Sequence, residues 1–96
     1  MRRLLVPAPA PAPVLDRPLR LHPQVAVRPE RFGALLYHFG TRRLSFLKEP
    51  RLLAAVEALD GTRTTREACA VAGITDGELP RYARALTTLE TTGMLQ

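Results

Sequence analysis

Short apolar runs separated by glycine and proline dominate the first half of the chain. Three such runs lie at about residues 24–28, 34–39 and 43–47. In the third run, Leu44 and Phe46 alternate with their neighbours and therefore fall on one face of an extended chain. Because short runs joined by Gly- or Pro-containing turns are typical of hairpins, the pattern predicts a three-stranded antiparallel meander.

The spacing of apolar residues lengthens to three or four after Pro50, which is the period of a helix. This spacing predicts three helices, at about residues 50–59, 64–72 and 76–92. Pro50 suits a first helical turn, and Thr64 with Glu67 three residues later has the spacing of a capping box. Three strands followed by three helices predict an α+β, winged-helix-like fold.

The third predicted helix carries two apolar stripes, one of which is expected to enter the core. The flanking stripe contains Tyr82, Ala85 and Leu89, with Arg81 beside it. These side chains are expected either to line an apolar groove or to pack against the sheet. Pro80 lacks an amide hydrogen, so the helix is expected to begin either with an irregular first turn or a few residues after residue 76.

Proline alternates with alanine from residue 7 to residue 13. Such a sequence has few backbone donors and favours an extended, solvated conformation. Residues 1–17 are therefore predicted to be a disordered tail, and residues 18–96 a single domain. The tail is either an inert leader or a docking stalk.

The chain has 96 residues and a formal net charge of +5, which is unevenly distributed. Nine basic and two acidic residues precede Glu49, whereas five basic and seven acidic residues lie from Glu49 onward, so the two parts carry +7 and −2. A basic half favours an anionic partner, which could be nucleic acid, an acidic peptide or a membrane surface.

Few side chains in the sequence are suited to catalysis or metal binding. Cys69 is the only cysteine and is expected to be a buried structural thiol, while His38 is expected on a strand surface and His22 at a strand entry. No paired carboxylates, phosphate loop or Ser–His–Asp set is recognisable, so neither an enzyme nor a cofactor or metal site is predicted. No apolar run approaches the roughly 18 residues that span a bilayer, which favours a cytoplasmic protein.

The run of residues 22–37, HPQVAVRPERFGALLY, resembles a family signature. Together with residues 43–47 and 59–61, it is similar to the PqqD-like peptide-recognition domains, and among these to the chaperones of mycofactocin biosynthesis. The resemblance covers about residues 18–96. It implies a winged-helix-like domain that binds the leader of a ribosomally made precursor peptide between its third strand and third helix. It also implies delivery of that peptide to a radical S-adenosylmethionine maturase.

The third predicted strand is the expected binding edge. The last strand of a meander has one side of its backbone unpaired, and an extended peptide can add there as a further strand. Basic residues bracket this strand and would favour an acidic peptide. The candidate peptide-binding residues are Arg42, Arg43, Leu44, Ser45, Phe46, Leu47 and Lys48 near the strand, and Arg81, Tyr82, Ala85 and Leu89 on the third helix.

Two other functions are consistent with the sequence. The first is a DNA-binding winged helix, suggested by the net charge and the helix-turn-helix rhythm. Against it, the strands precede the helices, and the third helix carries only Arg81 and Arg84 against three acidic residues. The second is a structural adaptor of the maturase that never touches the peptide. The expected oligomeric state is a monomer or a weak dimer.

Overall fold

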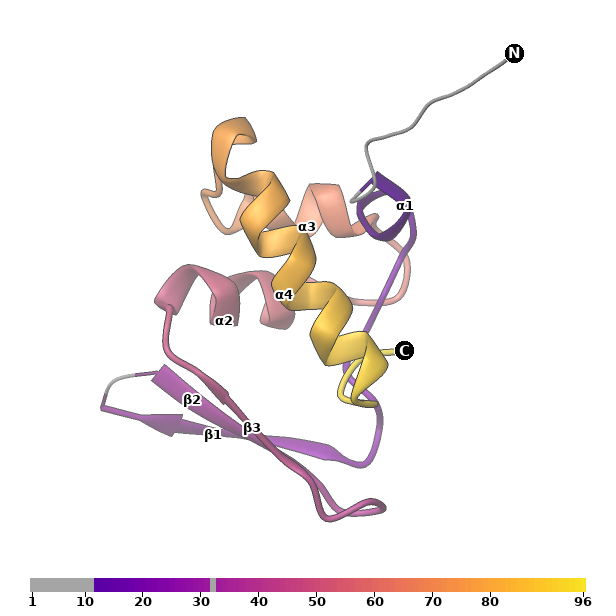
Figure 1. Ribbon diagram of the computed structural model, residues 1–96, viewed down its shortest axis with the longest axis vertical. Helices are drawn as coiled ribbons and strands as arrows, with labels where there is room; N and C mark the ends of the chain where they lie inside the picture. The colour runs from indigo at the N-terminus through magenta and orange to yellow at the C-terminus, as the bar shows by residue number, and fades with distance from the viewer. Residues whose placement is uncertain (1–11, 32) are drawn as a thin grey trace.

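The computed structural model describes residues 12–31 and 33–96, which form one sheet with helices packed on it (Figure 1). The strands are β1 (Val25–Glu30), β2 (Gly33–His38) and β3 (Leu44–Leu47). The helical segments are α1 (Ala12–Leu15), α2 (Pro50–Ala58), α3 (Thr65–Val71), the 3-10 turn η2 (Asp76–Glu78) and α4 (Leu79–Thr91). From β1 onward this is the predicted order, and the predicted α+β fold is confirmed.

β3 lies at an edge of the sheet. The strand order is β1-β2-β3, and both neighbouring pairs are antiparallel. The register places Ala34 opposite Leu47 and Leu36 opposite Ser45. Within the described residues, β3 therefore pairs with β2 on one side and with no strand on the other.

The helices lie on one side of the sheet (Figure 1). Along β2, Ala34, Leu36 and His38 are buried, whereas the residues between them are only half-buried. Leu36 belongs to the same apolar core as Val56 of α2 and Leu86 of α4. The period-two burial of β2 therefore matches a sheet with one face on the core and one face outside.

The start of α4 resolves the conflict created by Pro80. The η2 turn precedes the helix, and Pro80 is the second residue of α4, where a missing amide hydrogen leaves no helical bond unmade. At α3, the predicted capping box is confirmed: the Thr64 side chain accepts from the Glu67 amide at 3.1 Å, and the Glu67 carboxylate accepts from the Thr64 amide at 2.7 Å.

The prediction that the disordered tail extends to residue 17 is wrong for its last part. Residues Ala12–Leu15 form α1, and the side chains of Val14 and Leu15 are buried in the core. Two adjacent large apolar residues gain enough from burial to hold this segment against the helices, despite the prolines before them. The rest of the predicted tail, residues 1–11, lies outside the described residues.

His38 is buried, so its predicted placement on the strand surface is also wrong. Strand alternation puts it on the same face as Leu36. Its Nδ1 atom accepts hydrogen bonds from the backbone amides of Gly40 and Thr41 at 3.0 and 3.1 Å, and its ring lies 4.4 Å from that of His22. A buried polar ring is tolerated here because the turn after β2 supplies its partners.

The end of the chain is tied to the segment that precedes β1. The amides of Arg20 and Gln96 each donate to the carbonyl of the other residue, at 3.0 and 2.9 Å. Leu21 and Leu95 form an isolated antiparallel bridge. Among the described residues, no helix has the length and apolar character needed to cross a bilayer.

Candidate functional site

An apolar groove lies between β3 and α4. It has a volume of about 310 Å³ and is lined by Ser45, Phe46, Leu47, Leu52, Ala85, Thr88 and Leu89. None of these lining residues carries a charge. The volume is at the lower end of the roughly 300–1,000 Å³ of typical ligand pockets. The groove therefore suits one or two apolar side chains better than a large cofactor.

The backbone of β3 alternates between pairing with β2 and pointing away from it. The His38 amide donates to the Arg43 carbonyl at 3.0 Å, so these two residues form a hydrogen-bonded pair. Alternation in an antiparallel ladder then directs the amides and carbonyls of Ser45 and Leu47 toward β2. Those of Leu44 and Phe46 are directed outward, toward the side where another strand could add.

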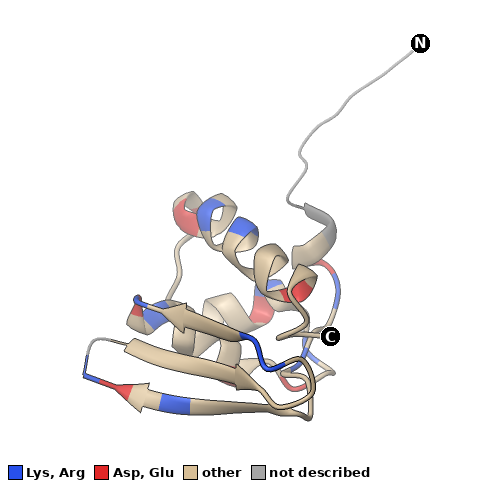
Figure 2. Ribbon diagram, turned by 60° about the horizontal axis from the view of Figure 1, so that its bottom comes forward, with Lys and Arg blue, Asp and Glu red and all other residues tan. Residues whose placement is uncertain are grey.

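Basic residues lie at both ends of β3 (Figure 2). Arg42 and Arg43 precede the strand, Lys48 follows it, and all three are exposed. Arg42 has a φ of 65°, which marks the tight turn that leads into β3. Among the described residues, none of the three has a carboxylate within ion-pair distance. Their charge is therefore available to an acidic partner.

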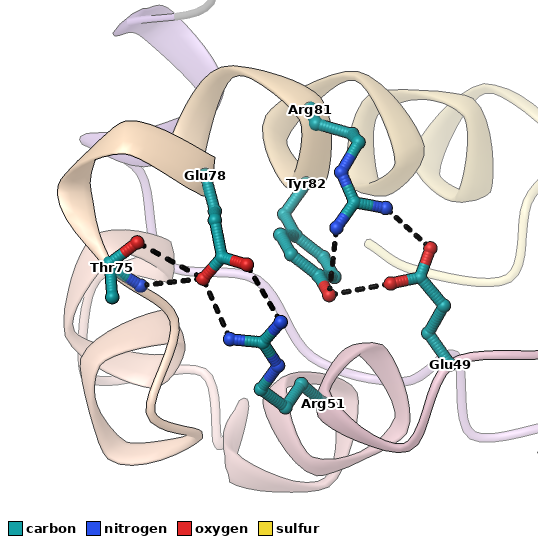
Figure 3. Close-up of polar contacts among 6 residues, drawn as sticks. All are labelled: Glu49, Arg51, Thr75, Glu78, Arg81 and Tyr82. Carbon is teal, nitrogen blue, oxygen red and sulfur yellow. Dashed lines mark hydrogen bonds and ion pairs between the residues drawn. The ribbon is translucent and has the colours of Figure 1, made fainter.

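Two of the predicted binding residues, Arg81 and Tyr82, lie in a polar network instead of on the groove wall (Figure 3). The Tyr82 ring is buried, while its hydroxyl donates to Glu49 Oε1 at 2.6 Å. Arg81 donates to Glu49 Oε2 at 2.5 Å, and its guanidinium stacks over the Tyr82 ring. Tyr82 and Arg81 hydrogen bonds hold the pKa of Glu49 below its usual range, and the carboxylate in turn raises the pKa of Tyr82.

A second part of this network joins α2 to the start of α4. Arg51 makes a bidentate pair with Glu78 at 2.6 and 2.7 Å, and the Glu78 carboxylate also accepts from the amide and hydroxyl of Thr75 (Figure 3). Glu49 directly precedes α2 and follows β3 by two residues. The network therefore fixes α4 relative to the junction between β3 and α2, and so helps to set the width of the groove.

The Glu78 contacts predict a specific dependence of stability on pH. The Arg51 pair and the Thr75 amide lower the pKa of Glu78 to about 2 in the folded state. In the unfolded chain it is roughly 4.3. Because the pKa of Glu78 is lower in the folded state, its ionised carboxylate stabilises the fold at pH values above the pKa of the unfolded chain. That contribution disappears as the pH falls from roughly 4.3 toward 2.

Glu78→Gln is accordingly expected to lower Tm at neutral pH, with the difference from wild type shrinking between roughly pH 4.3 and pH 2. Thermal unfolding followed by circular dichroism across this range measures the difference. Glu57→Gln, at an exposed position of α2, is the control and should show no such trend. A Glu78→Gln difference that stays constant with pH would contradict this assignment.

The groove includes two residues that the sequence analysis did not select, Leu52 and Thr88. Leu52 belongs to the apolar face of α2. The sequence of that face does not distinguish a residue that borders the groove from one that is buried in the core. Thr88 lies three residues after Ala85, so an extension of the flanking stripe by one helical turn would have found it. The predicted residues Ser45, Phe46, Leu47, Ala85 and Leu89 all line the groove.

The residues considered for other chemistry lie elsewhere. Cys69 is fully buried in α3, and burial raises the pKa of its thiol, so it stays protonated at neutral pH. Among residues 12–31 and 33–96, no group of three or more potential metal-ligating side chains comes together. What the groove offers is recognition: an apolar cleft beside a strand backbone with basic groups at both ends.

Comparison with known proteins agrees with this description. Residues 18–96 match the family described as the peptide chaperone MftB family. Relatives called peptide chaperone MftB include proteins from Mycobacterium ulcerans, 54% identical over 99% of this chain and 94% of the relative, and from Mycobacterium tuberculosis, 52% identical over 96% and 91%. A third, from Mycolicibacterium smegmatis, is 51% identical over 79% of this chain and 74% of its own length.

No solved structure matches the chain. The family match nevertheless spans every strand of the sheet and all of the helices from α2 onward. The similarity to the mycobacterial proteins extends over almost the whole of both sequences in two of the three comparisons. On these grounds, the chain belongs to the peptide chaperone MftB family.

Proposed function

We propose that this protein is a non-catalytic chaperone that binds the leader of a ribosomally made, mycofactocin-type precursor peptide and delivers it to a radical S-adenosylmethionine maturase in the cytoplasm. The observation that carries the proposal is the apolar groove between β3 and α4, beside the side of β3 that faces away from β2. The shared name of the relatives, peptide chaperone, supports a peptide as the bound partner.

The leader binds as an added strand in this proposal. The outward amide and carbonyl of Leu44 offer a donor and an acceptor of the kind that an added antiparallel or parallel strand pairs with. These main-chain bonds fix the register of the peptide without reading its sequence. Selectivity then comes from the side chains that the peptide directs into the groove.

The groove selects an apolar side chain. Leu47, Leu52 and Leu89 provide apolar walls, Ala85 leaves room between them, and no charged group lines the cleft. Side chains alternate along an extended peptide, so every second residue can point toward the groove. An aliphatic or aromatic residue placed there contributes roughly 1.5–3 kcal/mol through burial.

Filling the groove should therefore block the peptide. Ala85→Leu is expected to weaken leader binding by roughly tenfold or more, because the added side chain occupies the space of the apolar anchor. Isothermal titration calorimetry with the leader peptide measures the effect. Arg84→Leu, the same new side chain at the adjacent exposed position outside the groove, should bind the leader like the wild type. Equal affinities for Ala85→Leu and wild type would exclude the groove as the anchor site.

The basic ends of β3 favour an acidic leader. Reversing the charge at Arg42 and Arg43 is expected to reduce affinity by roughly two- to fivefold per residue, mainly by slowing association, and by less at high salt. Stopped-flow or surface plasmon resonance kinetics at low and high salt measure this. Arg63→Glu makes the same change in the loop between α2 and α3 and should leave the association rate unaltered. A loss that is confined to the dissociation rate would argue against steering by these charges.

A binary titration with the leader peptide and no enzyme tests the proposed function. Saturable binding by the isolated protein is expected. Absence of binding without the maturase would favour the structural adaptor. Duplex DNA at physiological salt serves as a second ligand. Micromolar or tighter DNA binding with a steep salt dependence would support the winged-helix alternative, which the pairing of Arg81 with Glu49 disfavours.

A further inference from the structure

The face of the sheet opposite the helices is apolar and exposed. Alternation places Leu44 and Phe46 of β3 on this outer face, across from Tyr37 and Leu35 of β2. Leu44 is 60% exposed, Phe46 is 43% exposed, and Phe39, just beyond β2, is 58% exposed. The Phe39 ring packs edge-on against Tyr37 with centroids 5.0 Å apart, so these two rings form one continuous surface.

This outer face lies on the opposite side of the sheet from the groove. In Figure 1 the described helices all lie on one side of the strands, and the outer face carries none of them. Ser45 and Leu47 point toward the groove, whereas Leu44 lies on the outer face and does not line it. Phe46 borders the groove at its rim and leaves part of its ring exposed on the outer face. A partner on the outer face can therefore bind while a peptide occupies the groove. Contiguous exposed apolar surface of this kind is characteristic of interaction sites.

The charges around the outer face indicate which partner it fits. Arg28 is opposite Leu35 in the sheet and therefore lies on the face itself. At the strand ends stand Arg31, Arg42, Arg43 and Lys48. Glu30, paired with Arg28 at 3.2 Å, is the single acidic residue in segment 25–48. Two copies stacked on this face would bring two strongly basic surfaces together. Charge complementarity instead favours a partner whose apolar patch is bordered by carboxylates.

We propose that the outer face of the sheet docks such a protein, and that this protein is the enzyme that modifies the bound peptide. The identity of the partner rests on the proposed function, whereas the docking chemistry rests on the face itself. The arrangement separates the two tasks of the chaperone: the groove holds the leader, and the opposite face of the same sheet holds the enzyme.

Phe39→Asp tests the apolar part of this surface, and Arg28→Glu tests its charge. Each variant is titrated with a purified radical S-adenosylmethionine maturase of the mycofactocin type and, separately, with the leader peptide. Phe39→Asp should weaken maturase binding by about tenfold or more, as loss of a central aromatic contact does, and Arg28→Glu by about threefold. Both variants should bind the leader within about twofold of wild type.

Val71→Asp is the matched control, because Val71 on α3 is 65% exposed and lies away from the sheet. It should bind both ligands like the wild type. Maturase affinities of Phe39→Asp and Arg28→Glu that equal the wild-type value would overturn the inference. Two other results would also overturn it. In these, the wild type binds vesicles of phosphatidylserine and phosphatidylcholine, or associates with itself, and Phe39→Asp abolishes that binding or association while it leaves maturase binding intact. Failure of the proposed function appears differently, as absent leader binding by the wild type.

Discussion

Replacing Leu44 with proline is expected to weaken leader binding by about tenfold or more while the domain stays folded. The Leu44 amide is directed away from β2, so its removal costs the sheet no internal hydrogen bond. Leu44 is also the first residue of β3, a position where proline is tolerated. In the complex, however, the peptide loses a main-chain donor, and the proline ring obstructs the approaching strand. Calorimetric titration with the leader measures the loss.

Leu44→Thr is the control for the lost side chain, because it keeps the amide and suits a strand. It should bind the leader within about twofold of wild type, since the Leu44 side chain lies on the outer face. Ser45→Pro is a contrasting variant: its amide is directed toward β2, so proline there should disrupt the sheet itself. Equal leader affinities for Leu44→Pro and Leu44→Thr would rule out strand addition at this end of β3.

Replacing Gly33 with alanine is expected to destabilise the domain by about 3 kcal/mol or more, which lowers Tm by roughly 12–24 °C for a domain of this size. Gly33 has a φ of 153°, and a Cβ atom there would lie 1.8 Å from the Leu47 carbonyl oxygen. That atom belongs to the backbone, so it cannot move without shifting β3 away from β2. Thermal unfolding by calorimetry or circular dichroism measures the loss.

Gly73→Ala separates the effect of contact from that of backbone strain. Gly73 also has a positive φ, 83°, but an added Cβ would meet nothing within 4 Å. Its replacement should therefore cost only the roughly 1–2 kcal/mol of a left-handed non-glycine residue. Gly33→Ala should also lose leader binding, because the strand that carries the peptide is displaced. Similar stability losses for the two variants would contradict the close approach of β3 to Gly33.

The strands, the helices and the position of β3 at an edge could be predicted from the sequence because each depends on local periodicity and turn residues. Alternation at residues 43–47 and helical spacing after Pro50 are visible in a short window of sequence. The capping boxes formed by Thr64 with Glu67 and by Thr75 with Glu78 likewise depend on residues only three positions apart. Ala85 and Leu89 could be placed on the groove wall because they share a helical stripe.

The remaining features depend on contacts between distant segments. Tyr82 was assigned to the same stripe as Ala85, but its hydroxyl reaches Glu49, which is 33 residues away in the sequence. The burial of Val14 and Leu15 depends on where the C-terminal helices lie. The turn at residues 39–43 decides whether the amide of Leu44 or that of Ser45 points outward. A shift of the β2–β3 register by one residue would turn the Ser45 amide outward in place of the Leu44 amide. The hydrophobic pattern alone does not determine this register.

Hydrogen exchange of the β3 amides, measured by NMR with and without the leader peptide, tests strand addition most directly. The Leu44 amide is expected to exchange more slowly once the leader is bound. The amides of Ser45 and Leu47, already bonded to β2, should change much less. Saturating leader that leaves exchange at Leu44 unaltered would contradict the central claim that the peptide pairs with β3.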